Sequence, residues 1–134
     1  MVTRRLLLTV ATFGVAAFVG ACSQPSPVSL EEETSSYHVQ LELDGTSLGQ
    51  RTASIEITDA SRRPVDAERV VVSTAMPSME MNGLTIVADE IETGRYEAQG
   101  DLFTMLGEST LTVRIEGSGS AAAEQATFTV EAEP

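Results

Sequence analysis

The chain has 134 residues and a formal net charge of −12, from eight basic and 20 acidic side chains. This balance disfavours nucleic acid or an anionic lipid surface as a partner, because such binding depends on clustered cationic side chains. The single cysteine, Cys22, excludes an intrachain disulfide framework, and the single histidine, His38, excludes a multi-histidine metal centre. A triad-type hydrolase would depend on His38, and no G-x-S-x-G motif accompanies it. We therefore expect a protein that is not an enzyme.

The first 21 residues predict an export signal. Arg4 and Arg5 precede an apolar run of 14 residues, from Leu6 to Val19. Spanning roughly 30 Å of hydrocarbon takes about 20 residues, so this run fits the core of a signal peptide better than a transmembrane helix. The paired arginines also fit a twin-arginine signal, so the general and the twin-arginine export routes both stay open.

The next residues, Val19-Gly20-Ala21-Cys22, resemble the lipobox of bacterial lipoproteins. The resemblance implies cleavage before Cys22 and attachment of lipid, palmitate included, to its thiol. It also implies an extracytoplasmic, for example periplasmic, protein anchored to the cell membrane or the outer membrane. An ordinary secretory signal with an incidental cysteine is the alternative. Residues 22–36 then form the lipidated N-terminus and a disordered tether, because they are rich in Ser, Pro and Glu and carry two aliphatic side chains, Val28 and Leu30.

From residue 37 onward, apolar side chains alternate with polar ones, and turn residues recur every 8 to 15 positions. This pattern predicts a small all-β domain over residues 37–134, an immunoglobulin-like sandwich of seven antiparallel strands. The expected strands cover residues 37–43, 53–58, 69–75, 84–88, 95–99, 111–115 and 126–130.

Strand direction places the loops. If successive strands alternate in direction, the connections over residues 44–50, 76–83 and 100–107 lie at one end of the sandwich. The tether, the turn at residues 59–64 and the Gly-Ser loop at residues 117–120 lie at the opposite end. His38 begins the first strand, so we expect it to face solvent beside the tether, about 20 Å from the first group of loops.

Four of the five methionines fall in that first group of loops. Met76, Met79 and Met81 form an M-x-x-M-x-M arrangement, and Met105 lies in the neighbouring loop. Thioether sulfur is a soft, uncharged ligand that favours Cu(I) over hard cations. Three or four thioethers from two adjacent loops could therefore bind one ion. The alternative is that these flexible side chains fill gaps at the end of the core.

A family resemblance rests on short motifs spread over most of the domain. They are residues 59–72, Met76-Pro77-Ser78-Met79, Gly94-Arg95-Tyr96-Glu97-Ala98 and residues 105–113. The chain resembles the YtkA-like, FixH-related domain family. That resemblance implies an extracytoplasmic immunoglobulin-like sandwich that handles copper or another heavy metal, with Met76, Met79 and Met105 at the family's methionine positions.

The sequence departs from that family at two points. The usual aromatic residue soon after the Met-x-Gly segment is missing, with Glu108, Ser109 and Thr110 in its place. Many members carry a histidine shortly after the second methionine, where this chain has Glu80, Met81 and Asn82. Either Met81 replaces the histidine as a thioether ligand, or the site has lost its metal.

These observations predict a membrane-anchored lipoprotein that binds Cu(I) through Met76, Met79 and Met81, with Met105 as a fourth candidate ligand. It would carry, buffer or deliver copper to a receiving protein without catalysing a reaction. The alternative is a metal-free interaction module that uses the same methionines to contact a membrane-complex partner.

Overall fold

The computed structural model describes residues 26–117 and 122–134, so the expected signal peptide and Cys22 lie outside the described residues. The described chain forms nine strands and one short 3-10 helix. These elements are β1 (Val28–Glu33), β2 (His38–Leu43), β3 (Gly49–Thr58), β4 (Arg69–Met76), η1 (Pro77–Met79), β5 (Met81–Val87), β6 (Asp89–Glu92), β7 (Arg95–Phe103), β8 (Gly107–Glu116) and β9 (Glu124–Ala132). Within the described ranges, no helix is long and apolar enough to cross a membrane.

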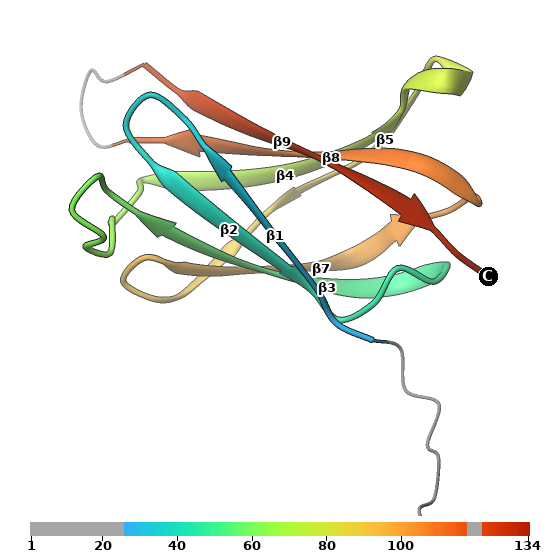
Figure 1. Cartoon of the computed structure of the whole chain (residues 1–134), viewed down its shortest axis with the longest axis horizontal. Coiled ribbons are helices and arrows are strands. Elements are labelled where there is room, and N and C mark those ends of the chain that lie inside the picture. Colours follow the sequence, from blue (N-terminus) through green and yellow to red (C-terminus); the bar gives the residue numbers. More distant parts are fainter. Residues whose placement is uncertain (1–25, 118–121) are drawn as a thin grey trace, which may run out of the picture.

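The strands form two antiparallel sheets that pack face to face (Figure 1). One sheet has the order β1-β2-β3-β7-β6 and the other the order β5-β4-β8-β9. The all-β prediction is confirmed, and each of the seven expected strands has a counterpart. The count of seven was wrong, because β1 and β6 were not expected.

β1 lies in the stretch predicted to be a disordered tether, and the structure corrects that prediction for residues 28–33. This strand pairs with β2 over its whole length, from Val28 opposite Leu43 to Glu33 opposite His38. Val28 and Leu30 stand two positions apart, so both point to one face of the strand and pack against the core. Two aliphatic side chains are enough to order this segment as a strand, because β2 supplies its backbone hydrogen bonds.

β6 was missed because it carries almost no sequence signal. Its residues, Asp-Glu-Ile-Glu, are all exposed, and Ile91 is its one apolar side chain. Only Ala88 separates β6 from β5, although the two strands belong to different sheets. The Ala88 amide donates a hydrogen bond to the Val70 carbonyl (2.8 Å), which holds the chain where it crosses between the sheets.

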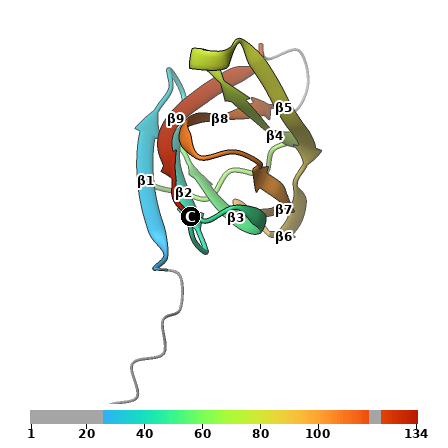
Figure 2. The same ribbon diagram turned by 90° about the vertical axis from the view of Figure 1, so that its right-hand side faces the viewer.

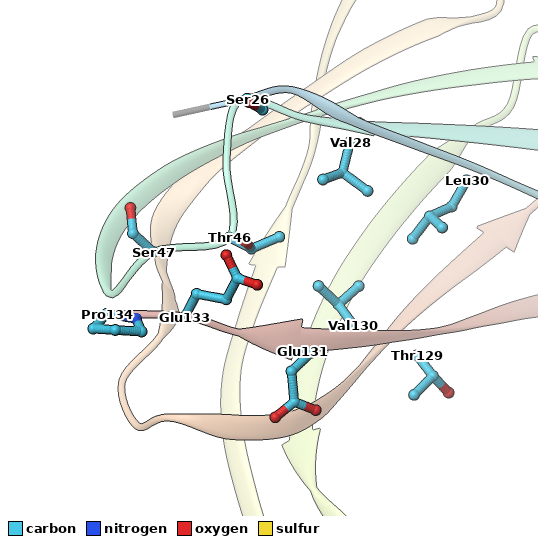
Figure 3. A pocket seen from close by; sticks show the side chains of 10 residues that line it. All are labelled: Ser26, Val28, Leu30, Thr46, Ser47, Thr129, Val130, Glu131, Glu133 and Pro134. Carbon is cyan, nitrogen blue, oxygen red and sulfur yellow. The ribbon is translucent and has the colours of Figure 1, made fainter. Parts of the chain in front are cut away.

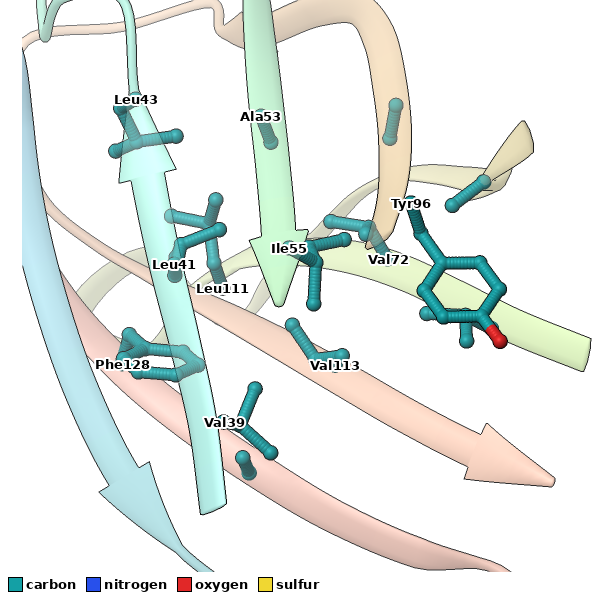
Figure 4. Close-up of a cluster of buried hydrophobic side chains, with 14 of the residues drawn as sticks. Val39, Leu41, Leu43, Ala53, Ile55, Val72, Tyr96, Leu111, Val113 and Phe128 are labelled. Atoms are coloured by element: carbon teal, nitrogen blue, oxygen red, sulfur yellow. The ribbon is translucent and has the colours of Figure 1, made fainter. Parts of the chain in front are cut away.

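The core fills the space between the inner faces of the two sheets (Figure 4). Val39, Leu41 and Ile55 from one sheet meet Leu111 and Phe128 from the other, and all five are nearly inaccessible to solvent. Tyr96 reaches across this interior, and its hydroxyl accepts a hydrogen bond from the Ala67 amide (2.7 Å). The core therefore fixes both the sheets and the long β3–β4 connection.

Three loops lie at one end of the sandwich, as predicted. They are residues 44–48, 77–80 and 104–106, and we call this end the Met-rich end (Figure 2). The registers establish the arrangement, since Gly49 lies opposite Phe103, Ala75 opposite Thr110 and Gly107 opposite Ala132.

The predicted position of the N-terminal segment was wrong. Because β1 adds one antiparallel strand before β2, the described chain enters at the Met-rich end, where Val28 lies opposite Leu43. Without β1 it would have entered at the opposite end. The C-terminus also lies at the Met-rich end, where the Glu133 amide donates to the Thr46 carbonyl (3.0 Å).

Candidate metal centre

Met76 and Met81 are paired residues at the end of the β4–β5 hairpin. Directly opposed residues of an antiparallel pair present their side chains on the same face of the sheet. Met76 is 8% exposed and continues the inward-facing positions of β4, which are Val70, Val72 and Thr74. Met81 therefore belongs to the core-facing side of the sheet, although half of its side chain is accessible to solvent.

A bulge in β5 creates this pairing. Val72 lies opposite Ile86, and a regular continuation of that register would place Met76 opposite Asn82. The register instead shifts between Ser73 and Ala75, where β5 contains one additional residue. A shift of one residue exchanges the two faces of a strand. The bulge thus turns Met81 from the outer face to the face that Met76 occupies.

Thr74 and Gly83 hold the bulge in place. The Leu84 amide donates a hydrogen bond to Thr74 Oγ1 (3.0 Å), and Thr74 itself is buried. A Cβ added to Gly83 would collide with Thr74 Oγ1, so this close approach favours glycine. Sequence reasoning did not identify either residue, although a glycine within a strand pattern is itself a signal for a bulge.

The turn between the two methionines is short and defined. Pro77 begins η1, and Glu80 ends it in the left-handed region (φ 51°), where its amide donates to the Pro77 carbonyl (3.2 Å). A non-glycine residue pays a steric cost in this region, so neighbouring contacts must maintain the conformation. Met79 lies on η1 and is 46% exposed.

Met76 and Met81 line one small cavity of about 30 Å³. The other lining residues are Thr74, Ala75, Asn82, Gly83, Leu102, Thr104 and Ser109. The two methionines therefore border one small space, which the bulge lines on one side and the end of β7 on another.

Met79 and Met105 lie at the same end but do not line that cavity. η1 lies close to β8, and Met105 is two residues before β8 begins. Met105 is 38% exposed. The structure thus brings all four predicted ligands to one end, and it places two of them around a common space.

Hard-ligand alternatives have little support. No group of three or more His, Cys, Asp or Glu side chains in the described part of the chain could hold a metal ion. Thioether sulfur, the ligand that the methionines at the Met-rich end would offer, needs no deprotonation and selects soft ions.

His38 lies at the opposite end from the methionines, as expected, but it does not face solvent freely. Its side chain is 14% exposed and lies between two glutamates of β1, with Nε2 3.9 Å from Glu31 and Nδ1 3.6 Å from Glu33. Nδ1 is buried and has no hydrogen-bond partner among the described residues. The unexpected strand β1 explains the difference, because it covers the side of β2 that would otherwise be open.

A much larger hollow has no methionine in its lining. It has a volume of about 620 Å³ and lies between β1 and β9, where the two sheets separate (Figure 3). Val28, Leu30 and Val130 line its apolar part, and Glu131 and Glu133 border it. It offers no ligand for a soft metal.

Comparison of the chain with family models, with curated proteins and with solved structures finds no match. The YtkA-like assignment accordingly stays a prediction from short sequence motifs. Functional inference for this chain depends on its own residues.

Proposed function

We propose that this protein binds Cu(I) at the Met-rich end and carries, buffers or delivers it outside the cytoplasm. The observation that supports the proposal best is the shared cavity of Met76 and Met81, which a bulge brings onto one face of the sheet. Met79 and Met105, from the adjoining turn and loop, are the candidates that complete a trigonal or tetrahedral set of thioethers.

The chemistry of the surroundings agrees with a cation as the ligand. Four uncharged thioethers leave the charge of a bound Cu(I) ion uncompensated by ligands. Exposed carboxylates at the same end, Glu80 and Glu108, can offset that charge through solvent, and the chain as a whole is strongly acidic. Catalysis is not part of this proposal.

We infer further that the sandwich is immunoglobulin-like. The immunoglobulin strand order is A-B-E-D in one sheet and C-F-G in the other, with C′ beside C in some members. The sheets here follow that order if β2, β3, β7 and β6 are A, B, E and D, and β5, β4, β8 and β9 are C′, C, F and G. β1 is then an addition outside strand A. This topology agrees with the fold that the YtkA-like resemblance implies.

The lipobox resemblance supports a lipid anchor at Cys22 and a location at the cell membrane or the outer membrane. A copper-receiving protein or a membrane complex would be the partner. The oligomeric state does not enter the proposal.

A competition titration tests Cu(I) binding. The protein is titrated with Cu(I) against a chromophoric Cu(I) chelator, beside a variant with Met76→Leu, Met79→Leu and Met81→Leu. Leucine preserves apolar volume, so the fold should persist, as thermal unfolding can verify. We expect the wild type to withdraw copper from the chelator and the triple variant to lose most of that ability. Equal affinities, or no measurable affinity in the wild type, would refute the copper site.

A metal-free interaction module is the second candidate. It is favoured by the exposure of Met79, Met81 and Met105, which leaves much of their apolar surface in contact with solvent. In that case the triple leucine variant would keep its function, because leucine offers a similar apolar surface, and copper would have no effect on it.

A further inference from the structure

The Met-rich end carries an unusual share of the exposed apolar side chains. Eight large apolar residues in the described part of the chain are well exposed, and five of them belong to the loops of this end or adjoin them. The five are Leu48, Met79, Met81, Met105 and Leu106. They come from three separate loops, so they form a set of apolar tips rather than one continuous strand face.

At least one of these loops is held in place. The Arg51 guanidinium donates from Nε to the Ser47 carbonyl (2.9 Å) and from Nη2 to the Leu48 carbonyl (3.3 Å). Ser47 also forms a bridge with Glu133 near the C-terminus. Leu48 is therefore presented to solvent by a fixed backbone.

The sequence that precedes the described chain leads to the same end. Val28 begins β1 at the Met-rich end, six residues after Cys22 and nine after the last residue of the apolar run, Val19. Six residues span at most about 20 Å when fully extended. The inference rests on the proposed membrane attachment: a lipid on Cys22, or the apolar run itself, would hold this end close to the bilayer.

From these observations we infer that the Met-rich end is a membrane-contact surface. The sandwich stands on the bilayer with the apolar tips at the boundary between headgroups and acyl chains, and the opposite end points away. Interfacial amphipathic helices bury their apolar face about 5–10 Å into that boundary, and the apolar loop side chains here would insert at the same level. The attachment segment enters the domain at the same end as these apolar tips, which favours lipid rather than a protein as the surface that they contact.

The charge at this end specifies the lipid. Asp44, Glu80 and Glu133 are exposed there, beside one partly buried cation, Arg51. Carboxylates are repelled by anionic headgroups. The surface is therefore suited to zwitterionic phospholipid.

The chain contains no tryptophan, which provides a direct test. Leu106→Trp introduces a single indole at the Met-rich end. Ile91→Trp introduces one at the opposite end, on β6, where the native residue is also apolar and exposed. Each full-length variant is recovered from membranes and reconstituted into phosphatidylcholine vesicles with and without brominated acyl chains, in a chelator that removes copper.

We expect brominated lipid to quench the indole at position 106 and to shift its emission to the blue, with little effect at position 91. The indole of Leu48→Trp should show the same quenching and blue shift as that of Leu106→Trp. Agreement between the two variants excludes a local folding defect in either one as the cause. Equal quenching at positions 91 and 106 would show that the domain lies on its side. No quenching at positions 48 and 106 would show that lipid is not the contact and would leave the surface to a protein partner. Either result overturns the proposal, and neither bears on Cu(I) binding, because the samples are free of copper.

Discussion

Val28 lies opposite Leu43, so the first residue of β1 is at the same end of the sandwich as the methionine loops. One additional strand thus reverses the orientation that the sequence suggested. With the proposed lipid anchor, the proposed metal ligands would face the membrane rather than the aqueous compartment. A copper carrier with this orientation would exchange its ion near the bilayer surface.

The contribution of β1 can be measured by Leu30→Ala. Leu30 is half-buried against the core, so we expect the free energy of unfolding to fall by about 1–2 kcal/mol, less than for a fully buried leucine. Ser29→Ala, at the neighbouring exposed position, is the control. Chemical denaturation measures the free energy of unfolding of each protein. Identical values for Leu30→Ala and the wild type would show that residues 28–33 do not pack as a strand and act as a tether.

The bulge in β5 can be tested through its hydrogen bond. Thr74→Val removes the hydroxyl that accepts from the Leu84 amide, at a cost of about 1 kcal/mol in stability. Because the bulge positions Met81, we also expect Cu(I) affinity to fall by about tenfold, as for other groups that orient metal ligands. Thr74→Ser keeps the hydroxyl and should restore affinity. If Thr74→Val binds Cu(I) as tightly as the wild type, the bulge does not position the ligand.

Tyr96 predicts a defined response to alkaline pH. Burial raises the pKa of its phenol above the ordinary value, although the hydrogen bond from the Ala67 backbone opposes part of the increase. The neutral phenol is therefore favoured in the folded state. Its contribution to stability is complete below about pH 10 and is lost as the pH rises through the folded-state pKa.

Tyr96→Phe should abolish that part of the pH dependence. The variant leaves the buried Ala67 amide without its partner, so we also expect a loss of about 1–3 kcal/mol at neutral pH. Denaturation from pH 7 to 11 would show a shallower alkaline decline for the variant than for the wild type. Tyr37→Phe, at a half-buried tyrosine, is the control. Parallel pH curves for Tyr96→Phe and the wild type would contradict the assigned role.

The lipid anchor is tested by Cys22→Ser. Lipidation requires the thiol, so we expect the serine variant to lose attachment to the membrane and to remain unprocessed or be released. Fractionation with an antibody against the domain distinguishes these outcomes. A serine variant recovered in the membrane at the mature size would contradict lipidation at Cys22.

The sequence predicted the strands that alternate cleanly, such as Val39-Gln40-Leu41-Glu42-Leu43 in β2. It did not predict β1 and β6, because their strand character depends on partners rather than composition. Val28 and Leu30 become a strand only beside β2, and Ile91 is the one apolar residue of β6. Local pattern cannot supply that tertiary information.

The candidate site likewise combines features that the sequence predicts with features that depend on tertiary contacts. The spacing of the methionines and the direction of the strands placed all four at one end. The pairing of Met76 with Met81 was not predictable from alternation, because a single additional residue in β5 changes the register. Gly83 marks the position of that residue, but its close contact with Thr74 is visible only in three dimensions.

The most direct test of the copper site observes each thioether separately. Methyl NMR of protein labelled with [13C-methyl]methionine, with resonances assigned from single leucine variants, is recorded during Cu(I) addition under reducing conditions. We predict that the Met76 and Met81 methyl resonances shift and saturate at one equivalent, with Met79 and Met105 shifting over the same range if they complete the ligand set. Unchanged Met76 and Met81 resonances in the presence of excess Cu(I) would contradict the account.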